Sequence, residues 1–199
     1  MIGRVLARRW LAAVLLLLSV AVVAGGAWTA VAEWEVESGV RVVNPGGTAG
    51  TALVVYHPGL SGFMPEMVNA FATGLASRGW RVELTTASSQ TLTDVSGYDL
   101  LALGAPTYWW SPALPVRRYV GRLPDLGGKP VALVVTASGQ PGRSRSVLEG
   151  EVREKGGDVV ASVPLTKWKP NVQEDSRPNE AVARGIARST GEEVGWEAR

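Results

Sequence analysis

The chain has 199 residues, of which 46% are hydrophobic, with 20 basic and 18 acidic side chains and one histidine. The absence of cysteine excludes disulfides, thiolate metal sites and a cysteine nucleophile. The single histidine, His57, argues against a histidine-based metal cluster or a Ser-His-Asp triad, because it would have to supply every imidazole alone.

The longest apolar segment, Trp10–Ala32, carries no charged residue. As a helix rising about 1.5 Å per residue it would reach roughly 34 Å, enough to cross a hydrocarbon core of about 30 Å. Arg4, Arg8 and Arg9 precede it and Glu33 follows it. Because basic residues stay on the cytoplasmic side, this pattern predicts a single-pass anchor in the cell membrane, with a cytoplasmic N-terminus and the remaining chain outside the cytoplasm.

A cleaved signal peptide is the alternative for residues 1–32. Ala30-Val31-Ala32 matches the small-residue cleavage pattern, and the arginines form a suitable basic start. The apolar stretch is long for a signal peptide, which favours the anchor. Both interpretations place the folded part outside the cytoplasm.

The charge of the exported part excludes nucleic acid as a partner. Without the three arginines of residues 1–32, 17 of the 20 basic side chains remain against all 18 acidic ones. This nearly neutral remainder contains no basic run that could neutralise phosphates.

Residues 33–50 are predicted to be a juxtamembrane linker that ends in the flexible joint "NPGGTAG", Asn44–Gly50. A single domain is expected over residues 51–190, followed by a polar tail over residues 191–199. Apolar, β-rich runs alternate with helical patterns in this domain, and they predict an α/β fold with a parallel sheet covered by helices on both faces. The predicted strands are Ala52–Tyr56, Trp80–Thr85, Asp99–Gly104, Pro130–Thr136 and Asp158–Val163.

Helical periodicity follows four of these strands. The predicted helices are Pro65–Arg78, a segment around Val116–Leu123, Ser146–Lys155 and Pro178–Ser189. Only a turn or short helix, at Leu92–Ser96, is expected between the second and third strands. In such sheets ligands bind at the carboxyl ends of the strands, so the loops after the first, third and fourth strands are candidate site loops.

The loop after the first strand, around Gly59–Gly62, precedes a helix start, where unpaired N–H groups and glycines can hold a phosphate. Neither the Walker pattern nor the G-x-G-x-x-G pattern is present. By itself the loop favours a simple tight turn between two elements over a phosphate site.

Longer segments show a more specific pattern. "SGFMPEMVNAFATGL" (Ser61–Leu75) resembles the phosphate loop and first helix of flavodoxin-like proteins. "GAPTYWWSPALPVRRYV" (Gly104–Val120) resembles their flavin-edge segment, and "VTASG" (Val135–Gly139) lies where a third flavin loop would be. The resemblance covers about Thr51–Ser189, and it implies a five-stranded parallel sheet of order 2-1-3-4-5 with FMN bound at its switch point.

The resemblance also implies roles for individual residues. Ser61 and Gly62 would contact the phosphate together with backbone N–H groups as far as Met64, and Ser138 and Gly139 would close one edge of the isoalloxazine ring. Next to a flat ring, flat aromatic side chains give favourable stacking. The residues expected around the ring are Thr107, Tyr108 and Trp109, and the wider predicted site adds His57, Gly59, Phe63 and Pro106.

Three single residues depart from the family pattern, and the turn at Pro58-Gly59-Leu60 is one residue longer than usual. His57 stands where a small hydroxyl residue is common, and Met64 replaces a threonine that would donate to the phosphate. Pro65 removes one backbone N–H from the helix start. Losing one hydrogen bond to a charged group costs about 1.5–3 kcal/mol, which weakens FMN binding without abolishing it.

Several of these residues have a simpler interpretation. His57 is either a phosphate donor or a solvated loop residue, and Trp109-Trp110 either stacks on flavin or covers the sheet edge and faces solvent. Arg117-Arg118 and Arg143–Arg145 could recruit an anionic nucleotide such as NAD(P)H, or form exposed faces. Trp168 either rests at a membrane interface or covers the sheet.

The leading hypothesis is a membrane-anchored FMN domain that acts as an electron carrier or oxidoreductase, with NAD(P)H or a protein as redox partner. Anchoring would raise its effective concentration near membrane partners. The alternative is a flavodoxin-like domain that has lost FMN and serves as a binding or assembly module. A hydrolase using Ser61 or Ser138 lacks a suitable base and orienting acid.

Overall fold

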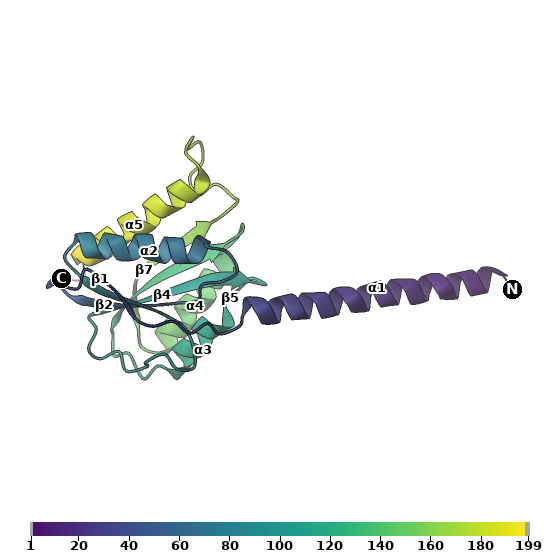
Figure 1. The fold of residues 1–199 in the computed structure, drawn as a ribbon, viewed down its shortest axis with the longest axis horizontal. Helices are drawn as coiled ribbons and strands as arrows, with labels where there is room; N and C mark the ends of the chain where they lie inside the picture. Colours follow the sequence, from purple (N-terminus) through teal and green to yellow (C-terminus); the bar gives the residue numbers. More distant parts are fainter. Residues whose placement is uncertain (1, 198–199) are drawn as a thin grey trace. The chain divides into compact units, whose positions relative to one another are not determined.

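The computed structural model describes the backbone of residues 2–197 and the side chains of residue 10 and residues 14–197. The chain divides into two compact units, Met1–Trp34 and Glu35–Arg199. The boundary therefore lies inside the predicted linker over residues 33–50, well before the predicted joint at Asn44–Gly50. The first unit contains one helix, α1 (Ile2–Ala32), and the second contains every other element of the fold (Figure 1).

Helix α1 carries an exposed apolar segment, Val14–Ala32. Within the described part of the chain, this segment alone is long and apolar enough to cross a membrane. A membrane anchor and a signal sequence share this property.

The second unit alternates strands and helices, as the hydrophobic patterns predict. Its elements are β1 (Arg41–Val43), β2 (Thr51–Tyr56), α2 (Phe63–Ser77), β3 (Arg81–Thr86), β4 (Leu100–Tyr108), β5 (Ser111–Pro112), α3 (Leu114–Arg122), β6 (Pro130–Ala137), α4 (Gly142–Glu154), β7 (Asp158–Thr166) and α5 (Asn179–Glu197).

The sheet runs in the order β1-β3-β2-β4-β6-β7, and β5 pairs with β4 outside this path. The pairs from β3 to β7 are all parallel. The five predicted strands therefore lie in the expected order 2-1-3-4-5. Sequence patterns missed two short antiparallel additions, β1 beside β3 and β5 beside β4.

Helices cover both faces of the sheet, with α2 and α5 on one side and α3 and α4 on the other (Figure 1). Phe71 and Trp80 are fully buried in the first core, and Tyr119 and Leu148 in the second. Both cores consist of residues from the second unit alone. Residues 35–199 thus contain what they need to fold without α1.

Several predicted boundaries were wrong in informative ways. Helix α2 begins at Phe63 because Pro65 is tolerated in a first helical turn. Strand β4 continues to Tyr108, so the expected loop residues Pro106 to Tyr108 belong to a strand that pairs with β6 and β5. The expected tail over residues 191–199 continues α5 to Glu197, because Val194 packs into the core and the Trp80 indole donates to the Gly195 carbonyl at 2.9 Å.

The segment before β2 belongs to the domain. The backbone N–H of Ser89 donates to Glu35 Oε2 at 2.8 Å, and Asn44 Nδ2 donates to the Trp80 carbonyl at 3.0 Å. At Gly50 an added Cβ would lie 2.7 Å from the Trp80 ring, so the backbone directly before β2 is tightly packed. A soluble fragment should therefore begin at Glu35, because a start near Asn44 would remove β1.

Candidate functional site

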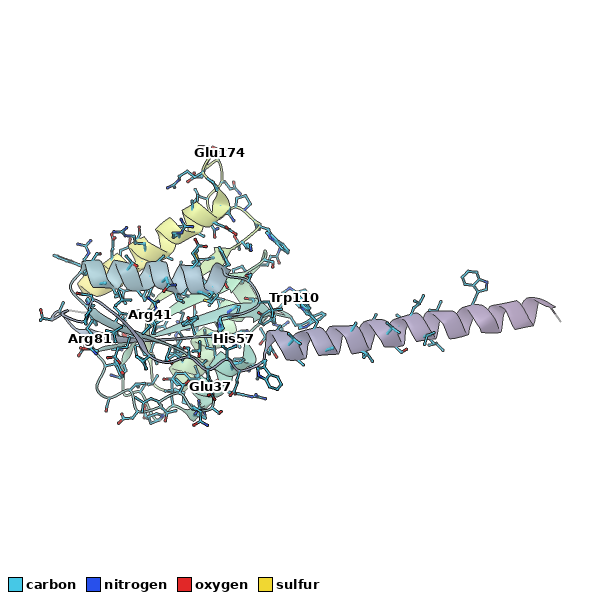
Figure 2. The ribbon with its side chains drawn as sticks, viewed as in Figure 1. Glu37, Arg41, His57, Arg81, Trp110 and Glu174 are labelled. Atoms are coloured by element: carbon cyan, nitrogen blue, oxygen red, sulfur yellow. The ribbon has the colours of Figure 1, made fainter. Side chains whose placement is uncertain are left out.

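The loop between β2 and α2, residues 57–62, is the first loop of the candidate site, although it lines neither of the two clefts described below. His57 is buried, with 2% exposure, and its N–H donates to the Gly104 carbonyl at 3.0 Å. The interpretation of His57 as a solvated loop residue is therefore wrong. Figure 2 shows His57 within the body of the domain, whereas Trp110 projects from its edge.

Gly59 and Tyr108 connect this loop to β4. Gly59 has a φ of +69°, which favours glycine, and an added Cβ would lie 3.0 Å from the Tyr108 hydroxyl. The same hydroxyl accepts a hydrogen bond from the Leu60 N–H at 3.3 Å. Tyr108 therefore lies against the first loop, and it does not line the cleft where the ring was expected.

Exposed backbone donors gather at the start of α2. Ser61 and Gly62 are exposed, and α2 has no side-chain cap. The N–H groups of Ser61 and Gly62 donate to no acceptor in the part of the chain that the structure describes. A helix start with open N–H groups attracts anions, so this loop can hold a phosphate.

Phe63 and Met64 contribute to this helix start only through their backbones. Both side chains are buried in the core beside α2, with 4% and 1% exposure. The Met64 sulfur lies near Gly104 on β4, so the side chain faces the sheet. The Met64 side chain therefore makes a core contact and offers no donor to an anion at the helix start.

The second loop of the candidate site is the hairpin between β4 and β5. Its two connecting residues, Trp109 and Trp110, both have left-handed backbones, with φ of 48° and 59°. Such two-residue turns normally use Asn-Gly, because a side chain with a Cβ is strained there. Trp109 is 67% and Trp110 58% exposed, and their ring centroids lie 6.5 Å apart. The chain thus presents two large indoles at a conformational cost.

Between this hairpin and the loop after β6 lies a cleft of about 230 Å³. Its walls are Thr107, Trp109, Trp110, Ala137, Ser138, Gly139 and Gln140. Four residues predicted from sequence, Thr107, Trp109, Ser138 and Gly139, meet here because β4 and β6 are parallel neighbours. No wall residue is ionisable, so the cleft suits a neutral group.

Thr107 supplies an open polar group beside this cleft. Its Oγ1 is buried and has no hydrogen-bond partner in the described part of the chain. Buried hydroxyls are normally paired, so this hydroxyl lacks the partner that a bound ligand would supply. Pro106, which was expected at the ring, is buried instead and packs near Gly59.

A larger cleft of about 460 Å³ adjoins the first and shares Trp110, Gly139 and Gln140 with it. Its remaining walls come from the start of α4, from the end of β7 and from the segment after β7, and they are Pro141, Gly142, Arg143, Pro164, Thr166, Lys169, Pro170 and Asn171. Sequence analysis missed this second cleft. The proline-flanked "KWKPN" directly after the last strand was the available signal.

Most basic residues that were considered for nucleotide binding are paired elsewhere. Arg117 contacts Glu151 at 2.6 Å, and Arg118 contacts Glu35 at 3.8 Å. Arg143 differs, because it lines the larger cleft and forms no ion pair with any described residue. Within the same described range, no cluster of three or more metal-binding side chains is present.

Comparison with solved structures gives three informative matches. A flavodoxin from the domain Archaea matches with a TM-score of 0.57 and 18% identity, over 74% of this chain and 98% of the flavodoxin. Flavodoxin 2 of Bacillus cereus matches with 0.56 and 18%, over 72% and 99% of the two chains. NAD(P)H:quinone oxidoreductase of Methanothermobacter marburgensis matches with 0.52 and 14%, over 72% and 96%.

The chain has a flavodoxin-like fold. Comparisons of the sequence with protein-family models and with curated proteins find no match. At these identities the structural likeness establishes the fold alone, and the function must be argued from the site.

Proposed function

We propose that residues 35–199 bind FMN at the carboxyl edge of the sheet and take part in electron transfer or oxidoreductase chemistry. The observation that carries the proposal is the buried, unpartnered Thr107 hydroxyl at a neutral cleft walled by Trp109 and Gly139. The open N–H groups of Ser61 and Gly62 at the neighbouring loop fit a phosphate.

In this proposal the chain holds FMN with three sets of groups. The N–H groups of Ser61 and Gly62, extended by those of Phe63 and Met64, bind the phosphate. Thr107 pairs with a polar atom of the ring, while the indoles exclude water from it. FMN supplies reversible electron transfer when it is bound, and the surrounding residues tune its potential. The cleft offers no acid or base of its own.

The redox partner and location belong to the same proposal. Helix α1 would keep the protein in the membrane, with the domain outside the cytoplasm. The larger cleft, with the cations Arg143 and Lys169, would admit an anionic partner such as NAD(P)H, or a protein. The fold likeness to an NAD(P)H:quinone oxidoreductase supports an oxidoreductase role.

A binding module without FMN is the second candidate, and Tyr108 favours it. Its hydroxyl already accepts the Leu60 N–H at 3.3 Å, which takes one donor from the phosphate loop. The smaller cleft, about 230 Å³, also lies below the usual range of ligand pockets, about 300–1,000 Å³. In this candidate the same edge would contact a partner protein.

Titration of FMN fluorescence with matched variants tests the proposal. Thr107→Val removes the open hydroxyl and should raise the dissociation constant about 3- to 10-fold, equivalent to about 0.5–1.5 kcal/mol. Thr73→Val is the control, because the Thr73 hydroxyl bonds only within α2, to the Asn69 carbonyl at 2.8 Å. Equal FMN affinity in both variants would refute the role of Thr107, and no binding in any variant would favour the module.

A further inference from the structure

Three exposed tryptophans lie at or near the two clefts at the carboxyl edge of the sheet. Trp109 and Trp110 form the tip of the β4–β5 hairpin. Trp168 follows β7 and is 77% exposed, so it does not cover the sheet. Its backbone N–H donates to the Ser138 carbonyl at 3.1 Å, which places the Trp168 backbone beside the loop after β6. Trp168 lines neither cleft.

The backbone fixes these side chains in their exposed positions. Asn179 Nδ2 donates to the carbonyls of Thr166, Lys167 and Lys169 at 2.8, 2.9 and 2.9 Å, so the segment that carries Trp168 is held on both sides. At the hairpin, both tryptophans occupy left-handed conformations that disfavour them. Large indoles that are held away from the core at such a cost indicate a contact surface.

The charged side chains beside these tryptophans indicate what kind of partner this surface would bind. Lys169 and Arg143 line the larger cleft without an ion pair in the described part of the chain. Lys167 is offset by Glu180 at 3.6 Å. The acids on the same segment are Glu174, at the far tip of the loop (Figure 2), and Asp175, which pairs with Arg177 at 2.6 Å. The immediate surroundings of the indoles are therefore cationic.

We propose that this edge, defined by Trp109, Trp110, Trp168, Arg143 and Lys169, contacts the surface of an anionic lipid bilayer. Tryptophan prefers the membrane interface, where its apolar ring and its N–H group are both satisfied, and neighbouring cations attract anionic headgroups. The apolar segment Val14–Ala32 of α1 independently suggests that a bilayer is near. The proposal does not depend on FMN.

The lack of native cysteine permits a direct test in the full chain. Trp168→Cys and Trp196→Cys would each carry one environment-sensitive label, in vesicles of phosphatidylcholine and phosphatidylglycerol. Trp196 is the matched control, because it is 65% exposed and lies beside Arg78, which precedes β3 at the opposite edge. We expect lipid-borne quenchers to quench the label at 168 and aqueous quenchers to reach the label at 196. Equal aqueous quenching at both positions would overturn the proposal and would favour a protein as the partner of this edge.

A second measurement uses the fragment of residues 35–199, which contains both cores and lacks α1. It should sediment with the same vesicles, and Trp168→Ser should weaken this association about tenfold through the loss of one inserted side chain. Trp196→Ser should leave it unchanged. Equal effects of the two variants, or no association of the fragment at all, would contradict lipid contact. FMN affinity should be the same in both variants, so a failure here is distinct from a failure of FMN binding.

Discussion

Replacing Trp109-Trp110 with Asn-Gly should stabilise the fold while weakening ligand binding. The two residues have φ of 48° and 59°, and each left-handed backbone of this kind costs roughly 1–2 kcal/mol, so relief is worth about 2–4 kcal/mol. Asn-Gly is the sequence that such a turn prefers.

Two losses offset this gain. Trp109 and Trp110 are 67% and 58% exposed, so little more than a third of each ring is buried. At about 1.5–3 kcal/mol for full burial of a large side chain, their loss costs roughly 1–2 kcal/mol together. The added glycine costs about 0.5–1 kcal/mol in backbone entropy. The net expectation is a gain of about 1 kcal/mol, which corresponds to about 2–4 °C in Tm for a domain of this size.

Thermal and urea unfolding of the fragment of residues 35–199 would measure this change. Trp168→Asn is the control, because Trp168 is equally exposed but its φ is not positive, so no strain is relieved. A Tm of the double variant that falls below the wild-type value would refute the strain argument. The same variant should bind FMN about tenfold more weakly, because an aromatic contact worth about 0.5–1.5 kcal/mol is lost.

Three further predictions concern the framework of the site. Gly74→Ala should destabilise the domain by about 1–3 kcal/mol in urea unfolding, because an added Cβ would lie 2.1 Å from a backbone carbonyl of α5. Burial and a hydrogen bond to Glu83 raise the pKa of Tyr98 from 10.0 to about 12. Since the unfolded state loses this proton first, the contribution of Tyr98 to stability should be fully present below pH 10 and fall as the pH rises towards 12, and Tyr98→Phe should reduce the slope in that range. Asn179→Ala should accelerate amide exchange in the segment after Thr166, because the Lys167 carbonyl loses its donor. The carbonyls of Thr166 and Lys169 each lose one donor and keep another, from Asn171 Nδ2 at 2.8 Å and Thr166 Oγ1 at 2.5 Å.

Each of these has a clear contrary result. Gly185→Ala has open space around the added Cβ and should be neutral or stabilising by up to about 1 kcal/mol, so equal losses at Gly74 and Gly185 would contradict the packing argument. An unchanged pH slope in Tyr98→Phe would show that another group, such as Tyr119, carries the alkaline transition. Unaltered exchange in Asn179→Ala would show that the loop is held by other contacts.

The sequence was sufficient for the central sheet because the strands there are buried on both faces. Runs such as those of β2, β4 and β6 are continuously apolar, and their parallel order brings Thr107 and Ser138 to one cleft. Strands β1 and β5 were not predicted because, with three and two residues, they are too short to show a hydrophobic period. They form only where a neighbouring strand already lies.

The rest of the site depends on long-range packing that no local pattern reports. His57 is buried because β2 continues its pairing with β4 into the loop. Tyr108 turns towards Gly59 because glycine leaves room for its hydroxyl. Two-residue hairpin turns are normally recognised by sequences such as Asn-Gly. Trp109-Trp110 forms such a turn without these residues, so the hairpin could not be predicted from the sequence.

Binding of FMN compared with riboflavin tests the central claim most directly. The fragment of residues 35–199 would be titrated into each flavin and followed by flavin fluorescence. Because the open N–H groups of Ser61 and Gly62 are proposed to hold the phosphate, FMN should bind with a sub-micromolar constant and riboflavin at least about tenfold more weakly. Equal affinity for the two flavins would contradict the phosphate loop, and unchanged fluorescence of both at high protein concentration would contradict the proposed flavin site.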